Sequence, residues 1–202
     1  MGKRVFRYFM GFLDAQEKWI NEMAADGWRL VKTSTLFYEF EPCEPGSYEY
    51  RVEFVGALSY GRIRDYQGFL SGLGYKVLTK NLNLNISFGK VRWRPFGRGI
   101  GQIVTSPGGY NKEILIIEKK ADGESFDVHS DYDGLIAYYQ SIRGMYITLL
   151  SIVVAFWALR LLTSIGPMPY AILAIAMVLL LIPIVLYSRR ISTYKRLRIT
   201  NE

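Results

Sequence analysis

A short acidic segment around the single histidine is the part of this 202-residue chain best suited to metal chemistry. In DVHSDYDGL, Asp127, His129, Asp131 and Asp133 occur at every second position. An extended strand would present these four candidate ligands on one side. The segment can instead begin a helix, with Ser130 and Asp133 as a capping box before GLIAYYQSI. We favour the helix start, and therefore expect no catalytic residue, no bound metal and no cofactor.

A second candidate is the glycine-rich basic stretch KVRWRPFGRGIGQIVTSPGGYNK, residues 90–112. It lacks the Gly-Lys-Ser/Thr ending of a phosphate loop, and more strand-forming sequence follows where a nucleotide site needs a helix. Trp93, Phe96 and Tyr110 lie among the arginines and could stack RNA bases. The sequence signature of the common RNA-binding module is absent, so nucleic acid is a disfavoured partner.

Residues 76–112 contain many cations and no acid, which makes them the one basic patch before residue 143. The alternation in NLNLNISFGKVRWRPF breaks at Gly89 and predicts a hairpin with Arg92 and Arg94 on one face. We interpret the patch as a binding surface for a protein partner, a lipid headgroup or an anionic ligand. Its predicted binding residues are Lys90, Arg92, Trp93, Arg94 and Arg98.

Two apolar runs near the C-terminal end predict membrane spans. MYITLLSIVVAFWALRLL covers 145–162 and MPYAILAIAMVLLLIPIVLY covers 168–187, close to the roughly 20 residues that cross a bilayer. A buried hairpin of a soluble protein is the alternative, but few residues remain to enclose helices that are apolar on every side. Arg160 could reach the interface or pair with a helix, and Pro183 should kink the second span.

The charge distribution supports membrane insertion more than nucleic-acid binding. Of the net charge of +7, residues 1–142 contribute 18 Lys and Arg against 17 Asp and Glu, whereas residues 143–202 contribute 7 against 1. The positive-inside rule then predicts a multi-pass protein of the cell membrane with both termini in the cytoplasm. The cations assigned to anchoring and orientation are Arg143, Arg189, Arg190, Lys195, Arg196 and Arg198.

Residues 1–142 are expected to fold as a cytosolic α+β domain. FLDAQEKWINEMAADGW has helical periodicity with Gly27 as a C-cap, and RIRDYQGFLSGLGY is a weaker helix. WRLVKTSTLFYEFE and SYEYRVEFV flank a Pro- and Gly-rich turn and predict a hairpin. With strands at VFRYF and YKVLT, the order βαββαβ favours a ferredoxin-like fold. The single Cys43 excludes an intramolecular disulfide.

The chain also resembles a known bacterial family. EKWINEMAADGWRL, FYEFE, SYEYRVEF and DVHSDYDGLIAYYQSI are similar to the family catalogued as domain of unknown function 2812. The resemblance implies a membrane protein of Gram-positive bacteria with C-terminal spans, often encoded beside PadR-like regulators, and it implies no known catalytic residues. This chain departs from the family pattern at Tyr75, where tryptophan is more familiar, and between Asn81 and Asn111, where a segment is inserted.

We therefore expect three parts: a cytosolic domain at 1–142 with an inserted basic segment at about 81–111, two membrane helices within 143–188, and a basic cytoplasmic tail at 189–202. The leading hypothesis is a non-enzymatic, membrane-anchored adaptor or sensor that binds a protein partner or small ligand. The alternatives are a small membrane enzyme or transporter-associated subunit acting on a lipid or envelope precursor, and a membrane-tethered RNA-binding domain. The expected partners are the lipid bilayer and a membrane or regulatory protein, and homo-oligomerisation stays open.

Overall fold

The computed structural model describes residues 2–34, 36–56, 58–82, 86–88, 91–93, 103–104, 113–124, 126, 132–163 and 170–201. Of residues 86–88, 91–93 and 103–104, it describes only the backbone. The chain divides into two compact units, unit 1 at Met1–Ser130 and unit 2 at Asp131–Glu202, and each is described by itself.

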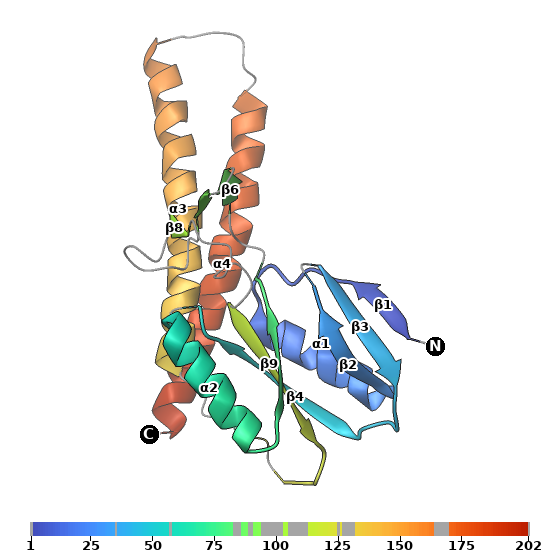
Figure 1. The fold of residues 1–202 in the computed structure, drawn as a ribbon. Helices are drawn as coiled ribbons and strands as arrows, with labels where there is room; N and C mark the ends of the chain where they lie inside the picture. The colour runs from blue at the N-terminus through green and yellow to red at the C-terminus, as the bar shows by residue number, and fades with distance from the viewer. Residues whose placement is uncertain are drawn as a thin grey trace. The chain divides into compact units, whose positions relative to one another are not determined.

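Three strands of unit 1 form a small antiparallel sheet, which we call sheet A (Figure 1). Its order is β1 (Lys3–Phe6), β3 (Phe37–Pro42), β2 (Trp28–Thr33), with β3 in the centre. The run WRLVKTSTLFYEFE is therefore two strands that pair with each other. The predicted hairpin between this run and the next one is wrong, because the next strand pairs elsewhere.

That next strand, β4 (Tyr48–Phe54), belongs to sheet B, whose order is β4, β9 (Ile114–Lys120), β5 (Lys76–Lys80). Both outer strands run antiparallel to β9. The four consecutive residues Ile114–Ile117 are fully buried. A strand covered on both faces needs such a continuous apolar run rather than an alternating one, which explains the central place of β9.

Helix α1 (Leu13–Ala25) has the predicted apolar stripe, with Leu13, Ile20 and Met23 buried. It ends as expected at a glycine, because Gly27 has a φ of +82° and a Cβ there would lie 3.0 Å from the Cys43 carbonyl oxygen. Helix α2 (Tyr60–Gly72) is capped by Ser59, whose hydroxyl accepts the Arg62 N–H. Both predicted helices of unit 1 are therefore confirmed.

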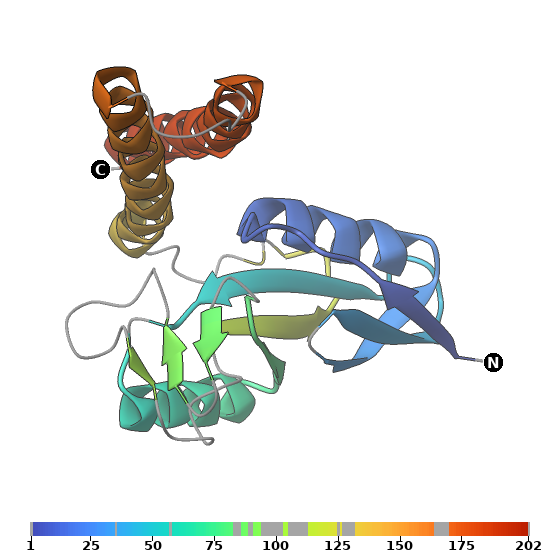
Figure 2. The ribbon, with the colours of Figure 1, turned by 90° about the horizontal axis from the view of Figure 1, so that it is seen from above.

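The two helices lie on opposite sides of sheet B (Figure 2). Ile63 and Leu70 of α2 pack in one cluster with Leu115 and Ile117, whereas α1 packs against β4 and β2. Trp19 of α1 meets the rings of Tyr38 and Phe40 at centroid distances of 5.0 and 5.6 Å. The mixed α+β class is confirmed, while the one-sheet ferredoxin-like arrangement with both helices on one face is not.

Side chains of α1 cap the outer edge of sheet B. Asn21 accepts a hydrogen bond from the Tyr50 N–H at 2.8 Å and donates one to the Tyr50 carbonyl at 2.9 Å. Glu17 accepts the Val52 N–H at 2.9 Å and pairs with Arg51 at 2.6 Å. Because β4 is an edge strand, these contacts satisfy backbone groups that could otherwise pair with another chain.

The inserted segment contains three short strands, β6 (Ile86–Phe88), β7 (Val91–Trp93) and β8 (Ile103–Val104). Strands β6 and β7 pair with Phe88 opposite Val91, and β8 pairs with β7. The predicted hairpin that turns after residue 88 is therefore confirmed.

Unit 2 is a hairpin of two helices, α3 (Tyr132–Thr163) and α4 (Tyr170–Asn201). Both are long and apolar enough to cross a membrane, and only 6% and 17% of their most apolar windows are buried. A core helix of a soluble protein would be mostly buried, so this exposure favours lipid as the surrounding medium. Helix α4 continues through Pro183 and includes residues 189–201, which the sequence suggested as a tail.

Helices α3 and α4 pack antiparallel. Where the start of α3 lies beside the end of α4, many of their contacts are between aromatic rings. Tyr139 stacks on Tyr194 at 5.7 Å and 12°. Asp133 pairs with Arg198 at 2.6 Å. At the opposite end, the buried Arg160 guanidinium lies 5.4 Å from the ring of Tyr170. Arg160 therefore contacts the other helix of the hairpin, as one of its two explanations predicts.

Candidate functional site

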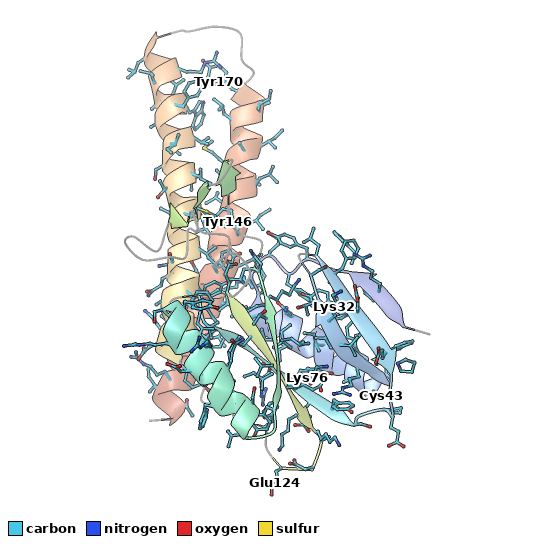
Figure 3. The ribbon with its side chains drawn as sticks, in the orientation of Figure 1. Lys32, Cys43, Lys76, Glu124, Tyr146 and Tyr170 are labelled. Atoms are coloured by element: carbon cyan, nitrogen blue, oxygen red, sulfur yellow. The ribbon has the colours of Figure 1, made fainter. Side chains whose placement is uncertain are left out.

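A partly open cleft of about 460 Å³ lies at the end of sheet B where β9 leaves the sheet. This volume is in the range that holds a small molecule. Lys76 at the start of β5 and Glu124 after β9 are two of its lining residues, and both are labelled in Figure 3. The charged residues of the lining are Arg29, Lys76, Glu118, Lys119, Lys120, Asp122 and Glu124.

A buried carboxylate organises the inner wall of the cleft. Glu118 is 3% exposed and accepts hydrogen bonds from Arg29 Nε at 3.1 and 3.2 Å and from Arg29 Nη2 at 2.7 Å. It also accepts the Tyr50 hydroxyl at 2.8 Å. Tyr50 in turn accepts the Leu30 N–H at 2.9 Å. The Glu118 charge is therefore compensated, as a buried charge must be.

These contacts fix protonation states as well as positions. Hydrogen bonding to Glu118 raises the pKa of Arg29 further above its usual value, so the guanidinium stays charged. Burial, reinforced by Glu118, raises the pKa of the Tyr50 hydroxyl, so this group stays a donor. The site thus presents a permanent cation held in one orientation.

Strand register brings two lysines onto the same face as Glu118. Lys76 is directly opposite Glu118 in the β5–β9 ladder, and Lys120 follows two positions after Glu118. Tyr48 is opposite Lys120 in the β4–β9 ladder, and its ring lies 4.3 Å from the Arg29 guanidinium carbon. Side chains alternate along a strand, so Lys119 belongs to the other face.

On that other face the charges are already paired. Lys119 Nζ lies 2.6 Å from Asp122 Oδ1 and donates to the Glu124 carbonyl oxygen at 3.3 Å. The hydrogen bond with Lys119 lowers the pKa of Asp122, and the same bond raises the pKa of Lys119. Neither Lys76 nor Lys120 forms an ion pair with any residue that the structure describes.

A second polar cluster in unit 1, around Lys80, adjoins a cavity that is too small for a ligand. Lys80 is 5% exposed, donates to the Ser34 carbonyl oxygen, and lies 4.4 Å from the Tyr38 ring centroid. The adjoining cavity is about 10 Å³, close to the room that one water molecule needs. Gln16 Nε2 and the Tyr38 hydroxyl, both in its lining, have no protein hydrogen-bond partner among the described residues. The cluster therefore fits a buried water.

The described residues include only part of the predicted basic patch. Lys90, Arg94 and Arg98 lie outside the described residues, and Arg92 and Trp93 are seen only as backbone in β7. Of the remaining cations in 76–112, Lys76 lines the cleft and Lys80 is buried, so these two do not share one surface. The two described cationic side chains of this patch, Lys76 and Lys80, therefore lie in different environments.

The acidic candidates Asp127, His129 and Asp131 also lie outside the described residues, as does the proposed cap Ser130. Asp133 is in the first turn of α3. Within the described ranges, no group of three or more His, Cys, Asp or Glu side chains could hold a metal ion. The anchoring cations are on the helices of unit 2, Arg143 on α3 and Arg189, Arg190, Lys195, Arg196 and Arg198 on α4.

Sequence reasoning missed the cleft because its parts are distant along the chain. Arg29 and Glu118 are 89 positions apart, and no local pattern links them. One signal was present: the acid in IIEKK follows four apolar residues, which places it at the end of a buried strand. A carboxylate in that position needs a cationic partner, although the sequence does not say which one.

The cleft and the start of the hairpin both fall within a single family match. The chain belongs to the family described as Protein of unknown function (DUF2812), whose model matches residues 12–151. The match covers all the lining residues of the cleft and ends at residue 151, within α3. No curated protein and no solved structure matches the chain.

Proposed function

We propose that this protein is a non-enzymatic, membrane-anchored adaptor or sensor. In this proposal unit 1 lies in the cytoplasm, unit 2 crosses the membrane twice, and both termini are cytoplasmic. Unit 1 binds a small ligand or a protein partner beside the membrane.

The observation that carries the proposal is the continuity of α3. The helix begins at Tyr132, two residues after unit 1 ends, and runs without a break into the apolar span up to Thr163. A continuous helix can carry a displacement from its cytoplasmic end into the membrane segment, which is what a sensor beside the membrane requires.

The proposed orientation rests on charge at one end of the hairpin. Arg143 precedes the apolar part of α3, and five cations follow the apolar part of α4. The linker SIGPMP between the two helices, residues 164–169, carries no charge. The positive-inside rule assigns the cationic end to the cytoplasm.

Cysteine labelling tests this topology. In a Cys43→Ser background, single cysteines at Ser192 on α4 and at Ser164 in the linker are exposed to a membrane-impermeant maleimide in intact cells. We expect labelling at position 164 and none at position 192 until the cells are opened. The reverse pattern, or labelling of both positions in intact cells, would contradict the proposal.

Purification tests the adaptor role. The full-length protein is extracted in mild detergent from its native host at its own expression level. A stoichiometric membrane or regulatory protein that is lost on R92E/R94E/R98E substitution supports an adaptor that uses the basic patch. Recovery of the protein alone, or with lipid only, would contradict a stable adaptor.

The alternative of a membrane enzyme depends on Asp127, His129 and Asp131, and it makes a different prediction. His129→Ala should abolish an enzymatic activity while leaving the folding of unit 1 intact. An adaptor should tolerate this substitution, with unchanged melting temperature and unchanged partner binding.

A further inference from the structure

We propose that the cleft at the end of sheet B binds a small anion, a carboxylate or a phosphate, through Arg29, Lys76 and Lys120. The proposal rests on the proposed sensor function and names the class of its ligand.

Arg29 is prepared for this role by its neighbours. Nε and Nη2 are fixed by Glu118, and the guanidinium is stacked on the Tyr48 ring at 4.3 Å. The Nη1 group makes no hydrogen bond with the residues that the structure describes, and the side chain is 34% exposed. A guanidinium held in this way loses little conformational entropy when it binds an anion.

The two lysines supply charge that the protein itself leaves uncompensated. Lys76 and Lys120 project from neighbouring strands on the face that carries Glu118. Each lacks an ion pair among the described residues, and an anion between them would remove their mutual repulsion. Their flexible stems can adjust to ligands of different size.

The carboxylates of the cleft do not cancel this charge. Glu118 is neutralised by Arg29, and Asp122 is neutralised by Lys119. Glu124 remains, and its side chain is exposed after β9. Two lysines against this one carboxylate leave the cleft positive, and the volume of about 460 Å³ suits a small molecule better than a folded partner.

Binding is tested on the full-length protein in nanodiscs of uncharged phosphatidylcholine. Inorganic phosphate and citrate are the two probes, and sodium chloride at matched ionic strength is the reference. We expect at least one probe to bind and to raise the melting temperature of unit 1 beyond the salt reference. Binding of phosphate alone identifies a phosphorylated ligand, and binding of citrate alone identifies a carboxylate.

The variant K76M/K120M should weaken binding of that probe about tenfold or more, since two of three cations are lost. The matched control K18M/K32M removes two exposed cations outside the cleft and should keep the affinity within about twofold. Equal binding by the cleft variant and wild type, or no effect beyond salt, would overturn the proposal. So would binding of an acidic peptide with no binding of either probe.

The topology assay separates the two proposals. If the full-length protein binds neither probe but shows the expected labelling at positions 164 and 192, only the proposed ligand class is refuted. An inverted topology refutes the cytoplasmic sensor itself, whatever the cleft binds.

Discussion

The Tyr50 hydroxyl donates a 2.8 Å hydrogen bond to Glu118 while accepting the backbone N–H of Leu30. Tyr50 and Glu118 belong to sheet B and Leu30 to sheet A, so one hydroxyl joins the two sheets. The Arg29–Glu118 pair also joins the two sheets, and Thr33 adds a further link, from its hydroxyl to the Thr79 carbonyl oxygen at 3.0 Å. These polar contacts therefore help to hold the two sheets of unit 1 together.

Replacing Glu118 by Gln should destabilise unit 1 by about 3 kcal/mol, because Arg29 loses its counter-ion and the buried network is broken. The free energy of unfolding is measured by denaturant titration of the detergent-solubilised protein. Glu44→Gln is the control, since Glu44 is exposed in a turn and should change stability by less than about 0.5 kcal/mol. An E118Q variant as stable as this control would contradict the structural role of the pair.

Tyr50→Phe should cost about 2 kcal/mol, because the Leu30 N–H and the Glu118 carboxylate both lose a partner while the ring volume is kept. Tyr48→Phe is the matched control: it removes a hydroxyl from the same strand without breaking a hydrogen bond seen among the described residues. Equal losses in the two variants would show that the junction does not depend on the Tyr50 hydroxyl.

Asn21→Ala should both destabilise unit 1, by about 2 kcal/mol, and promote self-association. The substitution leaves the Tyr50 N–H and carbonyl on the edge of sheet B without their caps. Light scattering during incubation measures the association. Glu22→Ala removes only an exposed pair with Lys18 and should leave the protein monodisperse, and similar aggregation of both variants would exclude edge exposure as the cause.

Lys80 should make stability increase with pH between about 8 and 10. Burial lowers the pKa of Lys80 to about 8, so in this window the folded state binds fewer protons than the unfolded state. The gain should be about 2 kcal/mol, and it should end near pH 10, where tyrosines of raised pKa such as Tyr38 begin to favour unfolding. Lys80→Met should abolish the increase, and Lys32→Met should keep it.

Local patterns predicted the local elements of this fold well. The stripe of Leu13, Ile20 and Met23 specified α1, and Gly27 specified its end. The pairing of strands was predicted poorly, because it depends on contacts between distant segments. In the sequence, β9 follows the whole inserted segment. No residue near Ile114 indicates that β9 will lie between β4 and β5 in sheet B.

The candidate site was harder to predict for the same reason. Burial of Lys80 could not be read from a run of cations that looks uniformly solvated. The role of the Arg29 guanidinium can be recognised only from the fold, which places Glu118 2.7 Å from it. Sequence composition located the hairpin of unit 2 correctly because a helix long and apolar enough to cross a membrane is recognisable from its own residues alone.

The length of α3 also determines how far its first residue lies from the hydrocarbon core in the proposed topology. A helix of 32 residues is about 48 Å long, and a hydrocarbon core takes up about 30 Å of it. In the proposed topology the remaining length of about 18 Å lies on the cytoplasmic side, which would put Tyr132 beyond the headgroups by more than one Debye length of about 8 Å. At that separation the potential of the anionic leaflet is largely screened. In the proposed topology, a change in lipid charge would therefore act more strongly on the part of the hairpin near the headgroups than on its end at Tyr132.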